Sequence, residues 1–170
     1  MKEANYWKMI TTVLSLEVSK GHLKWRITDL ARQAKVSRTL VYYHLGKSKS
    51  EIVNECLDRV ADEFYGLNEE RMKLVMSGRL KECVNRSQIM FQRYPEFIIF
   101  YFKWRMKSSP LQKKLIEIEM RYQNKLRMLF PRLKEDELVA FHAVMQGLVS
   151  TPFITPEIFD KAITMLKLPL

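Results

Sequence analysis

The sequence has few of the residues that interrupt helices, form disulfides or bind metals. Its 170 residues include five Gly, six Pro, two Cys and three His. Cys56 and Cys83 lack disulfide-like spacing, so we expect both thiols to be reduced and at least half-buried rather than part of a secreted disulfide scaffold. His22, His44 and His142 do not cluster, and no His or Cys pair has the spacing of metal ligands. We therefore expect no metal and no other cofactor.

Long apolar runs and catalytic motifs are missing as well. No segment approaches the roughly 18 consecutive apolar residues that span a bilayer, and the first ten residues, MKEANYWKMI, form no apolar signal segment. We therefore expect a cytoplasmic protein without a membrane partner. No Gly-rich phosphate loop, nucleophile turn or carboxylate pair in apolar surroundings is present. An enzyme is not expected, although a pocket with His142 beside a buried carboxylate would revive that hypothesis.

What is present is a series of amphipathic helices. No alternation of period two is long enough for a sheet, and 47% hydrophobic residues suffice for a sizeable core. We expect an all-α protein of about nine helices, with one domain at residues 1–50 and a helical bundle at residues 51–170. The expected helices cover residues 10–20, 27–34, 38–45, 50–76, 78–94, 95–106, 110–131, 134–150 and 156–168.

Residues 25–52 (WRITDLARQAKVSRTLVYYHLGKSKSEI) predict two short helices joined by a tight turn. Ser37 is expected to cap the second helix, with Val41 and Leu45 facing inward. A narrow apolar face on the first helix has the spacing i, i+3, i+4, i+7: Ile27, Leu30, Ala31 and Ala34. The outward residues of the second helix can donate to phosphate or reach base edges: Arg38, Thr39, Leu40, Tyr43 and His44. The pattern is typical of a helix-turn-helix, and an ordinary helical hairpin with a solvated polar face is the alternative.

Positive charge is concentrated on the segment that holds this motif. Residues 1–50 carry ten Lys or Arg against three Asp or Glu, whereas the other 120 residues carry 19 against 16. Such a distribution is expected when one part of a protein meets a polyanion. DNA is favoured over a membrane surface because the basic residues lie on turns and helix ends, not along one long amphipathic helix.

Several residues of this segment follow a known family pattern at matching spacing: Gly21 after the first helix, Asp29-Leu30-Ala31, Ala34, Val36, Ser37, Tyr42-Tyr43-His44-Leu45 and Lys49. On these residues, the first 60 positions resemble the DNA-binding domain of the tetracycline-repressor (TetR) family of bacterial transcriptional regulators. Motif and resemblance together predict ten DNA-binding residues: Thr28, Ser37, Arg38, Thr39, Leu40, Tyr42, Tyr43, His44, Lys47 and Lys49.

The segment departs from the family pattern at three points. Lys35 stands where the family usually has Gly, so it must adopt a left-handed conformation at a cost of about 1 kcal/mol. Leu45 replaces the usual Phe. One extra residue lies between Leu45 and Ile52, which leaves open whether Lys47 or Lys49 binds phosphate.

The helical half contains an aromatic segment, residues 94–106 (YPEFIIFYFKWRM), and eight of the ten methionines. These side chains are either ordinary core or the lining of a cavity for an apolar or aromatic small molecule. His142 is either a structural histidine or a polar anchor in that cavity. The resemblance implies an inducer in this half. The predicted effector-binding residues are Met90, Phe97, Tyr101, Trp104, Met120, His142 and Met145.

The last two expected helices carry broad apolar stripes: Leu138, Phe141, Met145, Leu148, Ile158, Ala162 and Leu166. The stripes predict a four-helix homodimer interface, with a monomeric bundle that buries both of them as the alternative. A dimer would also double the contacts with a palindromic operator in double-stranded DNA. We expect a TetR-type repressor released from its operator by a small apolar effector. The alternative is a TetR-like protein whose helical domain binds a protein partner.

Overall fold

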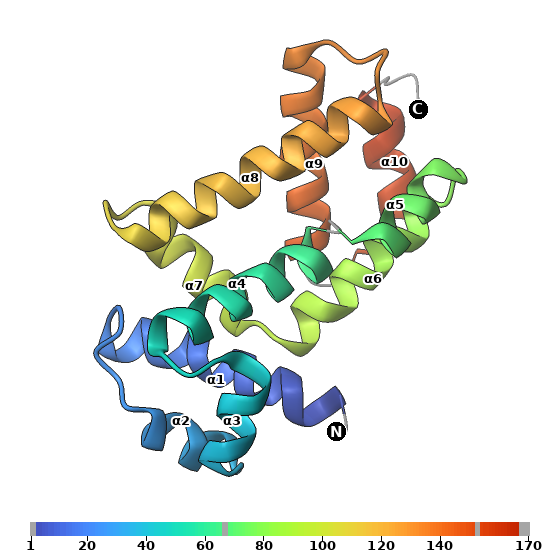
Figure 1. The fold of residues 1–170 in the computed structure, drawn as a ribbon. Helices are drawn as coiled ribbons and strands as arrows, with labels where there is room; N and C mark the ends of the chain where they lie inside the picture. The colour runs from blue at the N-terminus through green and yellow to red at the C-terminus, as the bar shows by residue number, and fades with distance from the viewer. Residues whose placement is uncertain (1–2, 66–67, 152–153, 167–170) are drawn as a thin grey trace. The chain divides into compact units, whose positions relative to one another are not determined.

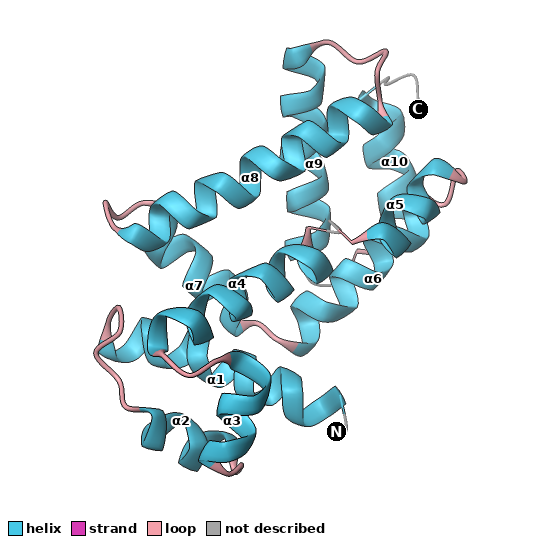
Figure 2. Ribbon diagram, viewed as in Figure 1, coloured by secondary structure: helices cyan, strands magenta, loops and turns pink. Residues whose placement is uncertain are grey.

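The computed structural model describes residues 3–65, 68–151 and 154–166, apart from the side chains of Pro156 and Leu166. These residues form helices joined by loops and contain no strand (Figures 1 and 2). The expected all-α class is confirmed. The helices are α1 (Glu3–Lys20), α2 (Ile27–Ala34), α3 (Arg38–Leu45), α4 (Lys49–Phe64), α5 (Glu69–Met76), α6 (Leu80–Arg93), α7 (Glu96–Arg105), α8 (Pro110–Leu129), α9 (Glu135–Ser150) and α10 (Pro156–Leu166).

One expected helix is divided in the structure. The sequence predicts a continuous helix over 50–76, but α4 ends at Phe64 and α5 begins at Glu69. The side-chain oxygen of Asn68 accepts a hydrogen bond from the Arg71 N–H at 2.8 Å, which starts a new helix. The expected break after Met76 is present, because Gly78 has a φ of 76°. The last two positions of the helix expected over 156–168 lie outside the described residues.

The chain divides into two compact units. Unit 1 comprises Met1–Val60 and Tyr94–Leu115, and unit 2 comprises Ala61–Arg93 and Ile116–Leu170. This differs from a simple division after residue 50, because α7 packs against α1 and so joins the N-terminal helices. Helices α4 and α8 each begin in unit 1 and end in unit 2.

Helix α1 is central to unit 1 and packs against both α2 and α7. Trp7 of α1 stacks on Tyr94, with ring centroids 5.3 Å apart and planes 22° from parallel. Buried side chains from α1, α2 and α3 complete this core: Ile10, Val13, Leu14, Leu30, Ala34, Val41 and Leu45. The apolar faces predicted for α2 and α3 are therefore the ones that pack inward.

Helix α7 is largely a core helix. It buries Phe97, Phe100 and Trp104, spaced i, i+3 and i+7, whereas Ile99 and Phe102 are 58% and 62% exposed. Burial of each such large side chain stabilises the fold by roughly 1.5–3 kcal/mol. The alternative that these three aromatic residues are ordinary core residues is therefore sufficient to explain them.

A buried carboxylate shapes the loop between α1 and α2. Glu17 is fully buried, and its Oε1 accepts hydrogen bonds from the Trp25 indole at 2.6 Å and the Leu23 N–H at 3.1 Å. His22 Nδ1 lies 3.0 Å from the other carboxylate oxygen. A buried carboxylate needs such donors because its desolvation is otherwise costly. Glu17 therefore fixes the chain that leads into α2.

The core of unit 2 lies between α6 and α9, with α8 and α10 contributing. Its buried members are Val84, Leu126, Leu133, Leu138, Phe141, Met145, Leu148, Val149 and Phe159. The stripe of α9 that predicted a dimer interface is therefore packed within its own chain. The alternative of a bundle that buries this stripe internally describes α9 correctly.

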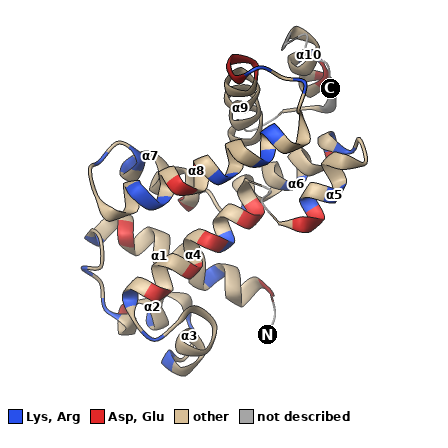
Figure 3. Ribbon diagram, turned by 45° about the horizontal axis from the view of Figure 1, so that its top comes forward, with Lys and Arg blue, Asp and Glu red and all other residues tan. Residues whose placement is uncertain are grey.

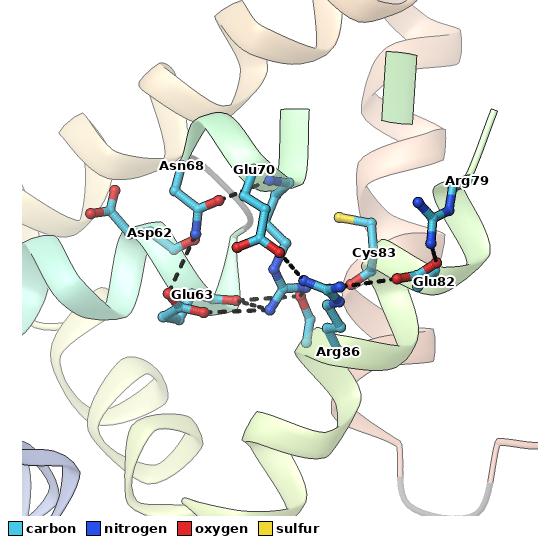
Figure 4. Close-up of polar contacts among 10 residues, drawn as sticks. Asp62, Glu63, Asn68, Glu70, Arg79, Glu82, Cys83 and Arg86 are labelled. Carbon is cyan, nitrogen blue, oxygen red and sulfur yellow. Dashed lines mark hydrogen bonds and ion pairs between the residues drawn. The ribbon is translucent and has the colours of Figure 1, made fainter. Parts of the chain in front are cut away.

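A buried arginine, Arg71 of α5, joins the end of α4 to α6. Figure 4 shows the polar contacts of this region, with Glu63 and Cys83 labelled. The Arg71 side chain is buried, and its guanidinium donates to the Glu63 carbonyl at 3.1 Å, to the Ser87 hydroxyl at 3.2 Å and to the Cys83 carbonyl. The Glu63 carboxylate lies 3.6 Å from the same guanidinium. Burial raises the pKa of the neighbouring Cys83 thiol, which keeps that thiol protonated at neutral pH. We call Arg71 and these partners the arginine clamp.

None of the helices in the described residues is long and apolar enough to cross a membrane.

The arginine clamp predicts an unusually large effect for one substitution. Arg71→Met keeps the length and apolar stem of the side chain but leaves buried carbonyls without their donor, so stability should fall by about 3–5 kcal/mol. Denaturant unfolding followed by circular dichroism measures the change. Arg127→Met is the matched control, because Arg127 pairs with Glu135 on an exposed surface and its loss should cost about 0–1 kcal/mol. Equal losses for the two variants would contradict the clamp.

Candidate DNA-binding surface

The turn between α2 and α3 is tight because Lys35 adopts the left-handed conformation that the sequence predicts. Its φ and ψ are 56° and 45°. The N–H of Lys35 donates to the Arg32 carbonyl at 3.2 Å, and the N–H of Val36 donates to the Ala31 carbonyl at 3.0 Å. These bonds satisfy carbonyls at the end of α2, as in other helices that end in a left-handed residue.

Ser37 caps α3 as expected. Its hydroxyl oxygen accepts a hydrogen bond from the Leu40 N–H at 3.1 Å. Val41 and Leu45 are buried, so one face of α3 packs against the rest of unit 1 and the opposite face is exposed to solvent. A helix held this way, close to a partner helix through a short turn, is the device by which many proteins enter a DNA major groove.

The outer face of α3 contains most of the predicted DNA-binding residues. Tyr43 is 81% exposed and Tyr42 is 39% exposed. His44 is half-buried, with its ring 4.7 Å from the Tyr43 ring and 6.2 Å from the Tyr6 ring. Leu40 is half-buried, and the remaining members on α2, the turn and α3 are exposed: Thr28, Ser37, Arg38 and Thr39. The structure thus places these eight residues in or beside the two short helices of unit 1.

A second capped turn connects α3 to α4. Gly46 has a φ of 118°, and a Cβ there would lie 2.7 Å from the Glu51 Cβ, so the turn requires glycine. Ser48 and Glu51 cap the start of α4: the Glu51 N–H donates to the Ser48 hydroxyl at 3.2 Å, and the Glu51 carboxylate accepts from the Lys47 N–H at 2.9 Å. The start of α3 and the start of α4 are therefore both held by local hydrogen bonds.

Lys47 and Lys49 have different surroundings. Lys49 is half-buried, and its ammonium donates to the carbonyl of Leu23, which itself has a φ of 56°. Lys47 is exposed. Lys49 thus helps to hold the loop before α2, whereas the Lys47 side chain extends into solvent.

The acidic residue of α2, Asp29, forms ion pairs with basic neighbours. The Asp29 carboxylate lies 2.6 Å from the Lys20 ammonium and 3.3 Å from the Arg32 guanidinium, and it accepts from the Arg26 N–H at 3.1 Å. The hydrogen bond from Lys20, followed by that from Arg26, lowers the pKa of Asp29. Asp29 therefore stays ionised and binds the side chains of Lys20, at the end of α1, and of Arg32, in the last turn of α2. Figure 3 shows blue segments in this part of the ribbon.

The predicted effector-binding residues are not gathered in one place by either unit. Phe97, Tyr101 and Trp104 belong to unit 1, whereas Met90, Met120, His142 and Met145 belong to unit 2. Met120 is 61% exposed, while Met145 is buried in the core of unit 2. Of the eight methionines in the helical half, five are more than 60% exposed: Met76, Met106, Met120, Met128 and Met165. These five are not placed as the wall of a closed cavity.

His142 has the most unusual surroundings of this group. Its Nδ1 contacts the Gln123 side-chain amide, and its ring lies 4.8 Å from the Tyr122 ring. In the described residues, His142 Nε2 and Gln123 Oε1 are buried without a hydrogen-bond partner. Burial lowers the pKa of His142, so its imidazole is neutral at pH 7.

No protein-family model matches the sequence, and no curated protein matches it. Among solved structures, the chain is similar to a TetR family transcriptional regulator, PfmR from Thermus thermophilus, at 19% sequence identity. The likeness covers 94% of this chain and 92% of the other, with a TM-score of 0.52. The fold is that of a TetR family regulator. The resemblance seen in the first 60 residues therefore extends, as a fold, to nearly the whole chain.

The left-handed Lys35 predicts a simple stabilising substitution. Lys35→Gly removes the steric cost of a Cβ at positive φ and should raise stability by about 1 kcal/mol. Lys35→Ala is the matched control, because it removes the same charge but keeps the Cβ, and it should leave stability nearly unchanged. Thermal unfolding of the two variants measures the difference. A Gly variant no more stable than the Ala variant would show that the turn carries no such strain.

Proposed function

We propose that this protein is a DNA-binding transcriptional regulator that reads its operator through α3. The observation that carries the proposal is the outer face of α3, exposed and capped at its start, within a fold shared with a TetR family regulator. Nine of the ten predicted residues form the proposed DNA-binding set. Lys47 is the proposed phosphate contact, and Lys49 is left out because its ammonium binds the Leu23 carbonyl.

The roles within the set follow from chemistry and position. Arg38 and Thr39 lie in the first turn of α3, where the recognition helices of helix-turn-helix proteins meet base edges. Tyr43 extends from the same helix one turn later and can contact a phosphate or a thymine methyl. Thr28 and Ser37 stand at helix N-termini, which favour phosphate oxygens. Lys47 adds a cation beyond the end of α3.

The protein is proposed to act as a homodimer on a palindromic site, with α9 at the interface. The face of α9 that is buried in its own chain cannot form the dimer interface, so we propose the opposite face of α9. Val139 is 54% exposed there, and Ala140, Ala143 and Gly147 are exposed beside it. No charged residue occurs between Leu138 and Ser150. Small uncharged side chains of this kind let two helices approach closely, so we propose that this face of α9 binds a second copy of the chain.

The predicted interface residues of α10 have different surroundings. Ile158 is 44% exposed and Ala162 is half-buried, while the side chain of Leu166 lies outside the described residues.

We further propose that the protein is a repressor and that an apolar effector releases it from DNA. Effector binding would favour dimers whose reading helices no longer match successive major grooves, roughly 34–36 Å apart. A protein partner in place of the effector is the second candidate. It is favoured by the exposed Ile99 and Phe102 on α7.

Selection of bound sequences from random duplex DNA tests the proposed function directly. A palindromic consensus is the expected result, because a two-fold dimer presents two identical reading helices. Failure to enrich any sequence, by a protein that is folded and dimeric, would overturn the proposal.

Substitutions on α3 should weaken binding to the selected sequence. Arg38→Ala and Tyr43→Ala should each cost about 1–3 kcal/mol of binding free energy, while helical content stays unchanged because both side chains are exposed. Fluorescence anisotropy with labelled operator measures the affinity, and circular dichroism checks the fold. Wild-type affinity in both variants would remove α3 from the interface.

The two lysines provide an internal control for that experiment. Lys47→Ala should weaken all sequences alike and reduce the salt slope by about one unit, since each neutralised phosphate contributes roughly 0.9. Lys49→Ala should leave the salt slope unchanged and lower thermal stability, because Lys49 binds the Leu23 carbonyl. The reverse result would return the phosphate contact to Lys49.

The proposed dimer interface predicts that a charge on the outer face of α9 separates the subunits. Ala143→Glu should yield a monomer in sedimentation and lower operator affinity, because an interface of about 1,200–2,000 Å² does not tolerate an unpaired carboxylate at its centre. Asn124→Glu, at an exposed position of α8, is the control and should remain dimeric. An Ala143→Glu protein that is still dimeric would place the interface elsewhere.

A further inference from the structure

An open pocket of about 460 Å³ lies within unit 2, between the first half of α6 and the start of α10, and we call it the cavity. Its apolar wall comes from Val84 of α6, Ile154 before α10 and Phe159 of α10. Asn85 and Gln88 of α6 add carboxamides. The volume is within the range of roughly 300–1,000 Å³ typical of small-molecule sites. None of the seven predicted effector-binding residues lines it.

Gln88 is the buried polar side chain among the residues that line this cavity. Its side chain is only 8% exposed. In the described residues it forms one hydrogen bond, from Nε2 to the Ile154 carbonyl at 3.5 Å, which is at the outer limit for such a bond. The carbonyl oxygen of the carboxamide accepts no hydrogen bond within the described residues and is not closed off from solvent. A carboxamide in that position can exchange water for a bound molecule that supplies both an acceptor and a donor.

The charges around the cavity already have partners. Lys81 binds both oxygens of Asp160, at 3.0 and 2.9 Å, and Arg79 is paired with Glu82. A charged ligand would have to displace one of these carboxylates or leave its own charge unpaired. An uncharged ligand avoids both losses, since the desolvation of an unpaired charge costs more than an exposed ion pair returns.

We propose that this cavity binds an uncharged, largely apolar compound that carries an amide group, and that it is the effector site of the regulator. The apolar body packs on Phe159, Val84 and Ile154, and the amide pairs with the Gln88 carboxamide. The second part of the inference rests on the proposed function, whereas the binding site itself does not.

The cavity wall is continuous with the arginine clamp. Glu82, which lines the cavity, contacts the Arg86 guanidinium at 3.0 Å, and Arg86 also pairs with Glu70 of α5 (Figure 4). Arg71, the next residue of α5, holds the Glu63 carbonyl at the end of α4. A ligand that moves the first turn of α6 therefore acts on a helix that is bonded to α4.

Methyl NMR of the full chain tests the site with two probes of equal size, benzamide and isopropylbenzene. Both should shift the methyl signals of Val84 and Ile154, and benzamide should bind more tightly because of its amide. Gln88→Met should weaken benzamide at least about tenfold, or about 1.4 kcal/mol, and leave isopropylbenzene unchanged. Asn85→Trp should block both probes by filling the cavity, whereas Gln92→Trp, exposed on the same helix, should block neither.

Two results would overturn the site: benzamide shifts confined to the surroundings of Tyr122 and His142, or equal benzamide affinity in the wild type and the Gln88→Met variant.

The effector role is tested separately with the selected operator. Saturating benzamide should weaken operator binding by the wild type but not by Asn85→Trp. Binding in the cavity without an effect on DNA affinity would overturn the effector role and leave the site. Absence of any selected DNA sequence would overturn the regulator and not the cavity result.

Discussion

Helix α4 is held at both ends by side-chain hydrogen bonds, and the function proposed for this protein depends on that constraint. At its start, Ser48 and Glu51 cap the helix directly after α3. At its end, Arg71 binds the Glu63 carbonyl and connects it to α6. Helix α4 begins in unit 1 and ends in unit 2, so its two capped ends belong to different units.

The reading helix could be predicted from the sequence because its signals are local. Ser37, Lys35 and Gly21 each act on backbone groups within four residues. Helix caps and turns of this kind can be predicted from a single sequence. The same is true of Val41 and Leu45, whose inward direction follows from helical spacing and from the position of the cap.

The parts that could not be predicted depend on distant partners. The Lys49 ammonium binds a carbonyl 26 residues earlier in the chain, so the sequence alone could not separate its role from that of Lys47. Periodicity showed that one stripe of α9 is buried, but it does not identify what covers a stripe, and here α6 of the same chain does. Arg71 carries no sequence signal of burial, since arginines are seldom fully buried. For the same reason the aromatic and methionine residues of the helical half could not be assigned to one cavity.

The magnitudes of the contacts indicate how an effector could act through this fold. A change of ten- to a hundredfold in DNA affinity requires about 1.4–2.7 kcal/mol of coupling. The ion pairs Glu82–Arg86 and Arg86–Glu70 are partly or largely exposed, and such pairs contribute only about 0–1 kcal/mol each. They are therefore too weak to carry the coupling alone. The buried clamp at Arg71 is strong enough, because its carbonyl partners lose their donors if α5 and α6 separate from α4. For the proposed effector between α6 and α10, the route of action would be a shift in the packing of α6, which Arg71 connects to the end of α4 through the Glu63 carbonyl.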